Sequence, residues 1–189
     1  MVNEESLLNS TEIVGEPPYQ FVKYLDRSVI REHVRALAAR MANDFRDKNP
    51  VFVGVLRGCF VFMADLVREV NIPCEIDFIK ISSYGNGMRA GRIEMKKEVG
   101  VDLRDRHVIL VDDIVDTGNS WDFLRNHLLE KRPASVTMAS MFRKPEAIQS
   151  NIPVDYVGMD LPNEFVVGYG LDHAGQWRQL PDLYILKNE

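Results

Sequence analysis

The chain has 189 residues, enough for one compact domain that buries roughly 70% of its unfolded surface and too few for two ordinary ones. Hydrophobic residues make up 46% of the sequence and charged residues 27%, which excludes intrinsic disorder, collagen and coiled coils. The formal net charge of −5 argues against a polyanion such as DNA as the main partner.

The sequence also argues against a membrane partner and against export. The longest apolar stretches, 51–56 and 58–64, are far shorter than the ~20 residues that a membrane helix needs. The N-terminus is acidic where a signal peptide would be basic. Cys59 and Cys74 lie in apolar contexts typical of buried free thiols and have no partners at metal-like spacing. We therefore expect a reduced, cytoplasmic protein.

The first part of the chain alternates between helical and strand patterns. Residues 1–18 predict a poorly structured leader that ends in Gly-Glu-Pro-Pro, and residues 19–189 a single domain. Apolar side chains recur at three- and four-residue steps over 26–45, which predicts an amphipathic helix capped by Asp26 or Ser28. The next predicted elements are a strand at 51–56, a helix at 60–70, a strand at 75–81, a turn at Asn86-Gly87 and a second extended arm from Arg92.

The second part of the chain repeats the same order. Residues 107–111 are apolar on both faces, as in a central strand of a parallel sheet, and 120–130 carry one apolar stripe of a helix. Further strands are predicted at 135–142, 154–159, 165–169 and 183–186. Together these elements predict an α/β fold with a mostly parallel twisted sheet flanked by helices. In such sheets, ligands bind beyond the carboxyl ends of the strands.

A polar string follows the predicted central strand directly, where a helix is expected to begin. It reads Asp112-Asp113-Ile-Val-Asp116-Thr117-Gly118-Asn119-Ser120. The backbone N–H groups of 116–120 suit a phosphate at the helix N-terminus, and Gly118 allows a close approach. The paired aspartates suit sugar hydroxyls or a hydrated magnesium ion. The alternative is that a side chain of this loop only caps the helix and the aspartates face solvent.

A second candidate anion site follows the first core strand. In Leu56-Arg57-Gly58-Cys59, the guanidinium of Arg57 and the amides after it precede a helix and can hold an anion opposite the first loop. The alternative is an exposed turn arginine.

The string after the central strand resembles the 5-phosphoribosyl pyrophosphate (PRPP) signature of the type I phosphoribosyltransferases, over about thirteen consecutive positions in a strand–turn–helix context. Further matches extend the resemblance to the hypoxanthine-guanine phosphoribosyltransferases over roughly 21–187. The resemblance implies a mobile flap at about 83–100 and a small base-binding hood. It also implies purine salvage: transfer of the 5-phosphoribosyl group from PRPP to N9 of a 6-oxopurine, either hypoxanthine or guanine with xanthine as a further candidate, giving IMP or GMP and pyrophosphate. A homodimer or homotetramer and Mg²⁺ as cofactor are expected.

The resemblance assigns a role to each matching residue. The residues assigned to bind the ribose and the 5-phosphate of PRPP are Asp112, Asp113, Asp116, Thr117, Gly118, Asn119 and Ser120. Asp116 is also assigned as the catalytic base. Pyrophosphate is assigned to Arg57, Gly58 and Arg178, with a cis peptide expected before Arg57. The residues assigned to the purine are Lys144 as donor to O6, Phe165 as stacking ring, Val166 and Asp172. Ser83 and Tyr84 are assigned to the tip of the flap. Magnesium is expected at Asp112, Asp113 and Asp172. His173 and Gln176 receive no role.

Plainer interpretations stay open for single residues: a buried strand residue for Tyr84, a solvated lysine for Lys144 and a core ring for Phe165. Asp112 stands where many members of the subfamily carry Glu, and Asn119 where residues are often bulkier or basic, which bears on fine substrate preference.

Two other functions are also open. A type I transferase for orotate or adenine would share 112–120 but not Lys144 together with the 165–172 string. A PRPP-sensing regulator that binds nucleic acid would need a basic face or an added DNA-binding segment, and neither the short acidic leader nor the net charge of −5 favours it.

Overall fold

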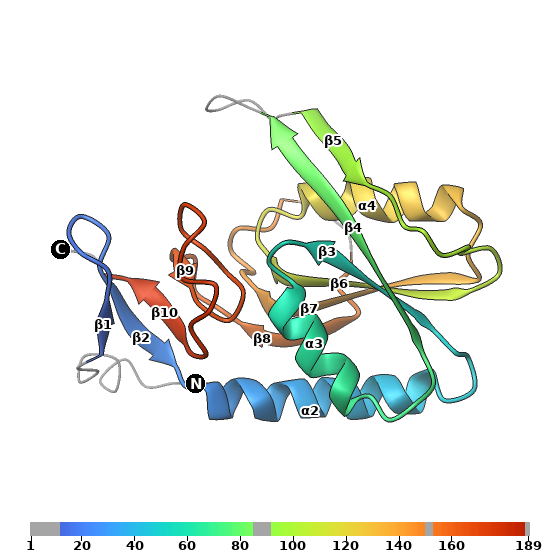
Figure 1. Ribbon diagram of the computed structural model, residues 1–189, viewed down its shortest axis with the longest axis horizontal. Helices are drawn as coiled ribbons and strands as arrows, with labels where there is room; N and C mark the ends of the chain where they lie inside the picture. The colour runs from blue at the N-terminus through green and yellow to red at the C-terminus, as the bar shows by residue number, and fades with distance from the viewer. Residues whose placement is uncertain (1–11, 85–91, 150–152, 188–189) are drawn as a thin grey trace.

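The computed structural model describes residues 12–84, 92–149 and 153–187 (Figure 1). Its helices are α2 (Arg27–Asp44), α3 (Phe60–Glu69) and α4 (Asn119–Glu130). Its strands are β1 (Ile13–Val14), β2 (Phe21–Leu25), β3 (Val51–Leu56), β4 (Glu75–Tyr84), β5 (Arg92–Lys97), β6 (His107–Val115), β7 (Ser135–Arg143), β8 (Tyr156–Asp160), β9 (Val166–Val167) and β10 (Leu183–Leu186). Within the described residues, no helix combines the length and the apolarity needed to cross a membrane.

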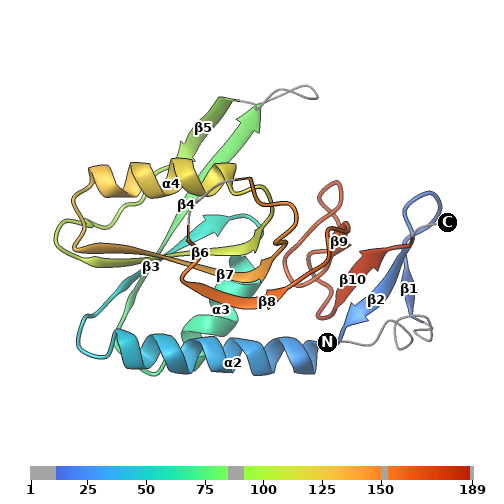
Figure 2. The ribbon, with the colours of Figure 1, turned by 180° about the vertical axis from the view of Figure 1, so that it is seen from behind.

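The main sheet has six strands in the order β5-β4-β3-β6-β7-β8. Strands β4, β3, β6, β7 and β8 are parallel, and β5 runs antiparallel at one edge. Helices α2 and α3 cover one face, and α4 covers the other, as Figures 1 and 2 show from opposite sides. The predicted α/β fold with a mostly parallel sheet is therefore confirmed.

Strand β6 is longer than predicted. It continues past Val111 to Val115 because β7 pairs with it as far as the register pair Val115 and Arg143. Asp112 and Asp113 therefore lie within the strand, and the expectation that they belong to the loop after it is wrong. On its other side, β6 pairs with β3 only as far as Val111. The sheet opens between β3 and β6 from that point onward.

Strands β4 and β5 form the predicted hairpin-like arm. Beyond Lys80, the last residue of β4 that pairs with β3, β4 pairs only with β5, and the register shifts between Lys80 and Ile81. The arm projects beyond the rest of the sheet (Figure 1). The expected turn at Asn86-Gly87 lies outside the described residues.

A second, smaller sheet stands at the side of the main one (Figure 1). It has the order β1-β2-β10-β9, and its neighbouring strands are antiparallel. Strands β9 and β10 were predicted, whereas β1 and β2 were not, because β1 lies within the expected leader and the sequence of β2, Phe-Val-Lys-Tyr-Leu, does not alternate between apolar and polar residues. Ile13 and Val14 pair with Val22 and Phe21. The expectation of a poorly structured leader over 1–18 is therefore wrong for residues 13–14. We call this sheet the hood.

The hood is joined to the main domain by Leu25, Val166 and Leu183, which pack into the main core, and by a polar group around Asp182, which is buried. Its carboxylate accepts a hydrogen bond from the backbone N–H of Arg27 at 2.7 Å and lies 3.0 Å from the ammonium of Lys23. The contact with Asp182 raises the pKa of Lys23. Glu12 joins the group through Lys23 at 3.4 Å and accepts a hydrogen bond from the Tyr184 hydroxyl at 2.6 Å.

The start of α2 adjoins this group. Asp26 caps the helix, as one of the two predicted alternatives had it, by accepting hydrogen bonds from Ser28 N at 2.8 Å and Ser28 Oγ at 2.7 Å. These bonds lower the pKa of Asp26.

Candidate active site

The two predicted anion-binding loops meet at one point of the main sheet. From β3 the chain proceeds to β4 on one side, and from β6 it proceeds to β7 on the other side, so the strand order reverses between β3 and β6. Ligands of open α/β sheets bind in the crevice at such a switch point. The Arg57 loop follows β3 and the 116–120 loop follows β6, so both lie at this crevice.

The loop after β6 leaves the start of α4 uncapped by any side chain. Gly118 is the N-cap residue, with a left-handed φ of 84°, and the helix shows no side-chain capping hydrogen bond. The alternative that Thr117, Asn119 or Ser120 merely caps the helix is therefore wrong. Asp116, Thr117 and Asn119 are exposed. The free amides at this helix N-terminus can thus receive an anion from the crevice.

The loop after β3 packs closely against β6. The peptide between Leu56 and Arg57 is cis, as the resemblance implied, and Arg57 itself is exposed. A Cβ atom at Gly58 would lie 1.6 Å from Oδ2 of Asp113, so only glycine leaves room for that carboxylate. The close approach places Asp113 directly beside the candidate pyrophosphate loop.

Asp112 and Asp113 form a buried acidic pair, each about 9% exposed, so the alternative that they face solvent is wrong. Oδ1 of Asp112 accepts a hydrogen bond from Asp113 N, and Oδ1 of Asp113 accepts one from Ile114 N, both at 3.0 Å. Burial and the neighbouring carboxylate raise the pKa of Asp112 well above its usual value. Burial also raises the pKa of Asp113, although the charge of Arg178 acts in the opposite direction.

Asp172 and Arg178 form an ion pair on the loop between β9 and β10. The second carboxylate oxygen of Asp172 accepts a hydrogen bond from Gly175 N at 2.7 Å, and Nη1 of Arg178 donates to the Gly170 carbonyl at 2.7 Å. These contacts hold the guanidinium where its charge reaches Asp113.

The three predicted magnesium ligands are not brought together. The described residues contain no group of three or more His, Cys, Asp or Glu side chains that could hold a metal ion, so Asp112, Asp113 and Asp172 form no three-ligand cluster. Magnesium is commonly held by one or two carboxylates together with substrate phosphates and water. A buried carboxylate pair whose negative charge is disfavoured suits that mode, because a cation would offset its charge.

Lys144 lies immediately after β7, next to the loop that follows β6. Its side chain is buried, the whole residue being 7% exposed, so the alternative of a solvated lysine is wrong. Its backbone N–H donates to the Val115 carbonyl at 2.9 Å, which holds the chain beside β6. The ammonium lies 3.6 Å from Oδ2 of Asp116, whose side chain is about half exposed. One cation and one carboxylate therefore stand side by side at the crevice.

Two of the other residues predicted to bind the base lie in hood strand β9 or directly before it. Phe165 is 44% exposed, so the alternative of a core ring is wrong, and Val166 is buried in β9. Ser83 and Tyr84 are the last residues of β4, and their backbones pair with Ile93 and Arg92. The structure therefore places the two anion-loop candidates at the crevice between β3 and β6, Phe165 and Val166 at hood strand β9, and the flap candidates on the arm.

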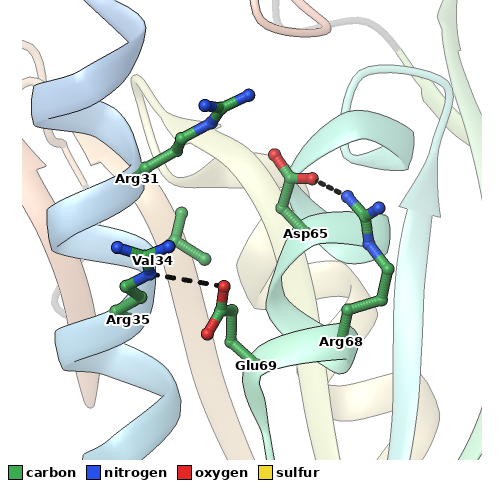
Figure 3. Close-up of a pocket in the computed structure, with 6 residues that line it drawn as sticks. All are labelled: Arg31, Val34, Arg35, Asp65, Arg68 and Glu69. Carbon is green, nitrogen blue, oxygen red and sulfur yellow. Dashed lines mark hydrogen bonds and ion pairs between the residues drawn. The ribbon is translucent and has the colours of Figure 1, made fainter.

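Two features near the site were not predicted from the sequence. One is an aromatic cluster in the hood that includes His173. The other is a polar cavity of about 280 Å³ between α2 and α3, lined by Arg31, Val34, Arg35, Asp65, Arg68 and Glu69 (Figure 3). Asp65 also accepts a hydrogen bond from the Tyr169 hydroxyl at 2.9 Å, which links α3 to the β9–β10 loop. Both features depend on contacts between segments that are distant in the sequence, so no local sequence pattern predicts them.

Comparisons with known proteins agree on one family. Residues 23–174 match the family model described as "Phosphoribosyl transferase domain". The chain is 42% identical over 161 residues to a hypoxanthine-guanine phosphoribosyltransferase of Streptococcus pneumoniae, covering 85% of this chain and 89% of the relative. It is 37% identical over 175 residues to one of Streptococcus pyogenes, covering 92% and 97%.

Solved structures are similar throughout. A hypoxanthine-guanine phosphoribosyltransferase of Bacillus anthracis, with a HEPES molecule in its active site, has a TM-score of 0.85 at 34% identity and covers 93% of this chain and 100% of its own. A hypoxanthine phosphoribosyltransferase of Trypanosoma cruzi, solved to study how its C-terminal region affects oligomeric state and activity, has a TM-score of 0.84 at 34% identity and covers 92% and 95%.

Proposed function

Because the chain belongs to the phosphoribosyltransferase family, and within it to the hypoxanthine-guanine phosphoribosyltransferases, we propose that it transfers the 5-phosphoribosyl group from PRPP to N9 of hypoxanthine or guanine. The products are IMP or GMP and pyrophosphate, and the reaction salvages free bases. Xanthine is a further candidate base, because it also carries O6.

The contact that carries the proposal for the base is the ion pair between Lys144 and Asp116, 3.6 Å apart. O6 and N7 of a 6-oxopurine lie on the same edge of the base. Lys144 can donate to O6 while Asp116 accepts the proton from N7 as general base. The amino group of adenine would present a donor where Lys144 needs an acceptor, so the pair favours oxopurines over aminopurines. Phe165 provides the stacking ring, and Val166 the backbone that reads the base edge.

PRPP would lie along the crevice between β3 and β6. The uncapped amides of 116–120 suit its 5-phosphate, and Asp112 and Asp113 suit the ribose hydroxyls. Breakage of the bond from C1 to pyrophosphate puts positive charge on the ribose and negative charge on the leaving group. The buried carboxylates oppose the first charge, while Arg57, the amide of Gly58 and Arg178 oppose the second. Interactions that strengthen as these charges develop are the ones that accelerate the reaction.

Magnesium is proposed as the cofactor. Asp172 on the pyrophosphate side and the Asp112–Asp113 pair on the ribose side are the residues that would hold it, directly or through water. When bound, it would neutralise charge on the pyrophosphate leaving group. Each of these carboxylates also has contacts of its own in the structure, with Arg178 for Asp172 and with backbone N–H groups for the pair.

We propose further that the flap residues Ser83 and Tyr84 close over the reacting sugar, that the protein is cytoplasmic, and that it assembles as a homodimer or homotetramer. Light scattering after size-exclusion chromatography measures the assembly, and a monomeric mass would contradict it. A nucleic-acid partner is not proposed, because the chain carries a net charge of −5.

The decisive experiment supplies the purified protein with PRPP and magnesium and follows nucleotide formation separately with hypoxanthine, guanine, xanthine, adenine and orotate. Turnover confined to the three 6-oxopurines is expected. Because these bases differ only at C2, their relative rates show which C2 substituent the protein prefers. Turnover with adenine or orotate would overturn the assignment of Lys144. Binding of PRPP without turnover on any base would favour the regulator instead. Parallel wells with EDTA test the need for magnesium.

A further inference from the structure

We propose that His173 is a positioning residue for the purine base, because it holds the ring of Phe165 in the orientation that stacking requires. The proposal rests on the proposed function, in which Phe165 stacks on the base. No role for His173 follows from the sequence.

His173 lies at the centre of an aromatic cluster in the hood. Its ring stands perpendicular to the ring of Phe165, with an interplanar angle of 89° and 5.6 Å between centroids. Tyr19 covers it at 4.3 Å, and Phe21 lies 6.1 Å from it and 6.2 Å from Phe165. Phe165 is therefore supported by two rings, of which Phe21 is fully buried and His173 partly exposed. Perpendicular aromatic pairs at these distances are favourable beyond the area they bury.

The backbone at His173 forms a tight, hydrogen-bonded turn. His173 and Gln176 exchange two backbone hydrogen bonds, at 3.2 and 3.0 Å, and the residues between them have positive φ angles of 50° at Ala174 and 84° at Gly175. This is the geometry of a two-residue hairpin turn of type I′. The Asp172 carboxylate accepts a hydrogen bond from Gly175 N at 2.7 Å and closes the turn further. The turn therefore fixes where the His173 ring stands.

The same turn also carries the pyrophosphate side of the site. Asp172 precedes His173 and is paired with Arg178, whose guanidinium donates to the Gly170 carbonyl. One short hairpin thus bears both the support of the base ring and the ion pair of the leaving-group side. His173 acts only through Phe165, so its loss should weaken binding of the base and leave binding of PRPP unchanged.

The test compares His173→Ala with His173→Phe, which keeps an aromatic ring at the position. A ring contact of this kind contributes roughly 0.5–1.5 kcal/mol, so the alanine variant should raise KM for hypoxanthine and guanine by about 2- to 12-fold. KM for PRPP and kcat should stay within about two-fold, and the phenylalanine variant should restore KM for the base. His33→Ala, the same substitution on α2, is the matched control and should change neither KM.

Three outcomes would overturn the inference: an unchanged KM for the base in His173→Ala, an equal rise of both KM values, or a folded His173→Phe variant that fails to restore KM. Calorimetric binding of GMP gives a readout without turnover and should show the same loss and the same recovery. A wild-type protein that neither turns over oxopurines nor binds GMP would overturn the proposed function and this inference together. Normal turnover with an unaffected alanine variant would overturn this inference alone.

Discussion

The two halves of the proposed site are held in place by different means. The half on the main sheet rests on strands β6 and β7, paired from His107 and Ser135 to Val115 and Arg143, with apolar clusters on both faces. The hood half rests on strands of two to five residues around a core cluster of Phe21, Val167 and Tyr184. The charged groups that would stabilise the reaction mostly stand on the rigid half. The ring that would receive the base stands next to β9 on the hood, which has the smaller core of its own and packs Leu25, Val166 and Leu183 into the main core.

The largest effect is expected from Asp116→Asn, which tests the half of the site on the main sheet. Removal of a general base typically costs 10²–10⁴-fold, so kcat should fall by about that factor, whereas KM for PRPP should change by no more than a few fold. Steady-state kinetics with hypoxanthine measures both. Asp105→Asn is the matched control, because Asp105 lies before β6, at the opposite end of the strand. Equal losses in kcat and in PRPP affinity would remove the assigned role.

The preference for 6-oxopurines over adenine should also depend on the half of the site on the main sheet. Lys144→Ala removes the donor to O6, and Lys144→Met removes the charge while keeping most of the stem. Both should reduce the ratio of kcat/KM for guanine to that for adenine, by about 10²-fold or more, since a site built to hydrogen-bond a substrate group discriminates strongly against analogues lacking it. An unchanged ratio in either variant contradicts the assignment.

The polar group around Asp182 in the hood is tested by Lys23→Met, which leaves the buried Asp182 with the backbone N–H of Arg27 as its remaining partner among the contacts described above. Loss of one member of a fully buried pair costs about 3–5 kcal/mol, but the Lys23 side chain is 24% exposed, so we expect about 1–2 kcal/mol in the free energy of unfolding. KM for the base should rise more than kcat falls. Urea denaturation measures the stability, with Arg35→Met as control, because Arg35 belongs to an exposed pair with Glu69.

A smaller effect is expected at the base of the arm formed by β4 and β5. Asp77 accepts hydrogen bonds from Phe78 N and Gly100 N at 2.6 Å and from Val101 N at 3.1 Å. Burial alone would raise the pKa of Asp77, but these bonds outweigh it and lower the pKa. The ammonium of Lys97 adds a further contact at 3.1 Å.

A lowered pKa in the folded state stabilises the protein above the unfolded value of about 3.9 and ceases to do so as the pH falls through the folded value. Asp77→Asn should therefore lose about 1 kcal/mol of unfolding free energy at pH 7, and the difference from wild type should shrink as the pH falls below about 4. Denaturant unfolding from pH 3 to 7 measures this. A difference that does not depend on pH would mean that the carboxylate charge is not involved.

The half of the site on the main sheet could be predicted from the sequence, whereas only β9 and β10 of the hood could, for a physical reason. Loops after β3 and β6 follow long apolar runs, so their place at the carboxyl edge of a parallel sheet follows from local pattern. The burial of Asp112 and Asp113 does not follow from local pattern, because it depends on the pairing of β7 with β6 beyond Val111. The role of Asp182 and the ring cluster around His173 depend on contacts between segments far apart in the chain, which no local spacing encodes.

The pairing of β2 with β10 joins Leu186 to Phe21, so the hood unites the two ends of the described chain. During synthesis on the ribosome, β3 to β8 can begin to pair while the last strand is still unmade. The hood sheet cannot, because β10, one of its two central strands, follows all of these strands in the chain. A nascent or C-terminally truncated chain without β10 would therefore hold the loops after β3 and β6 and the Lys144–Asp116 pair before the sheet beside Phe165 can form.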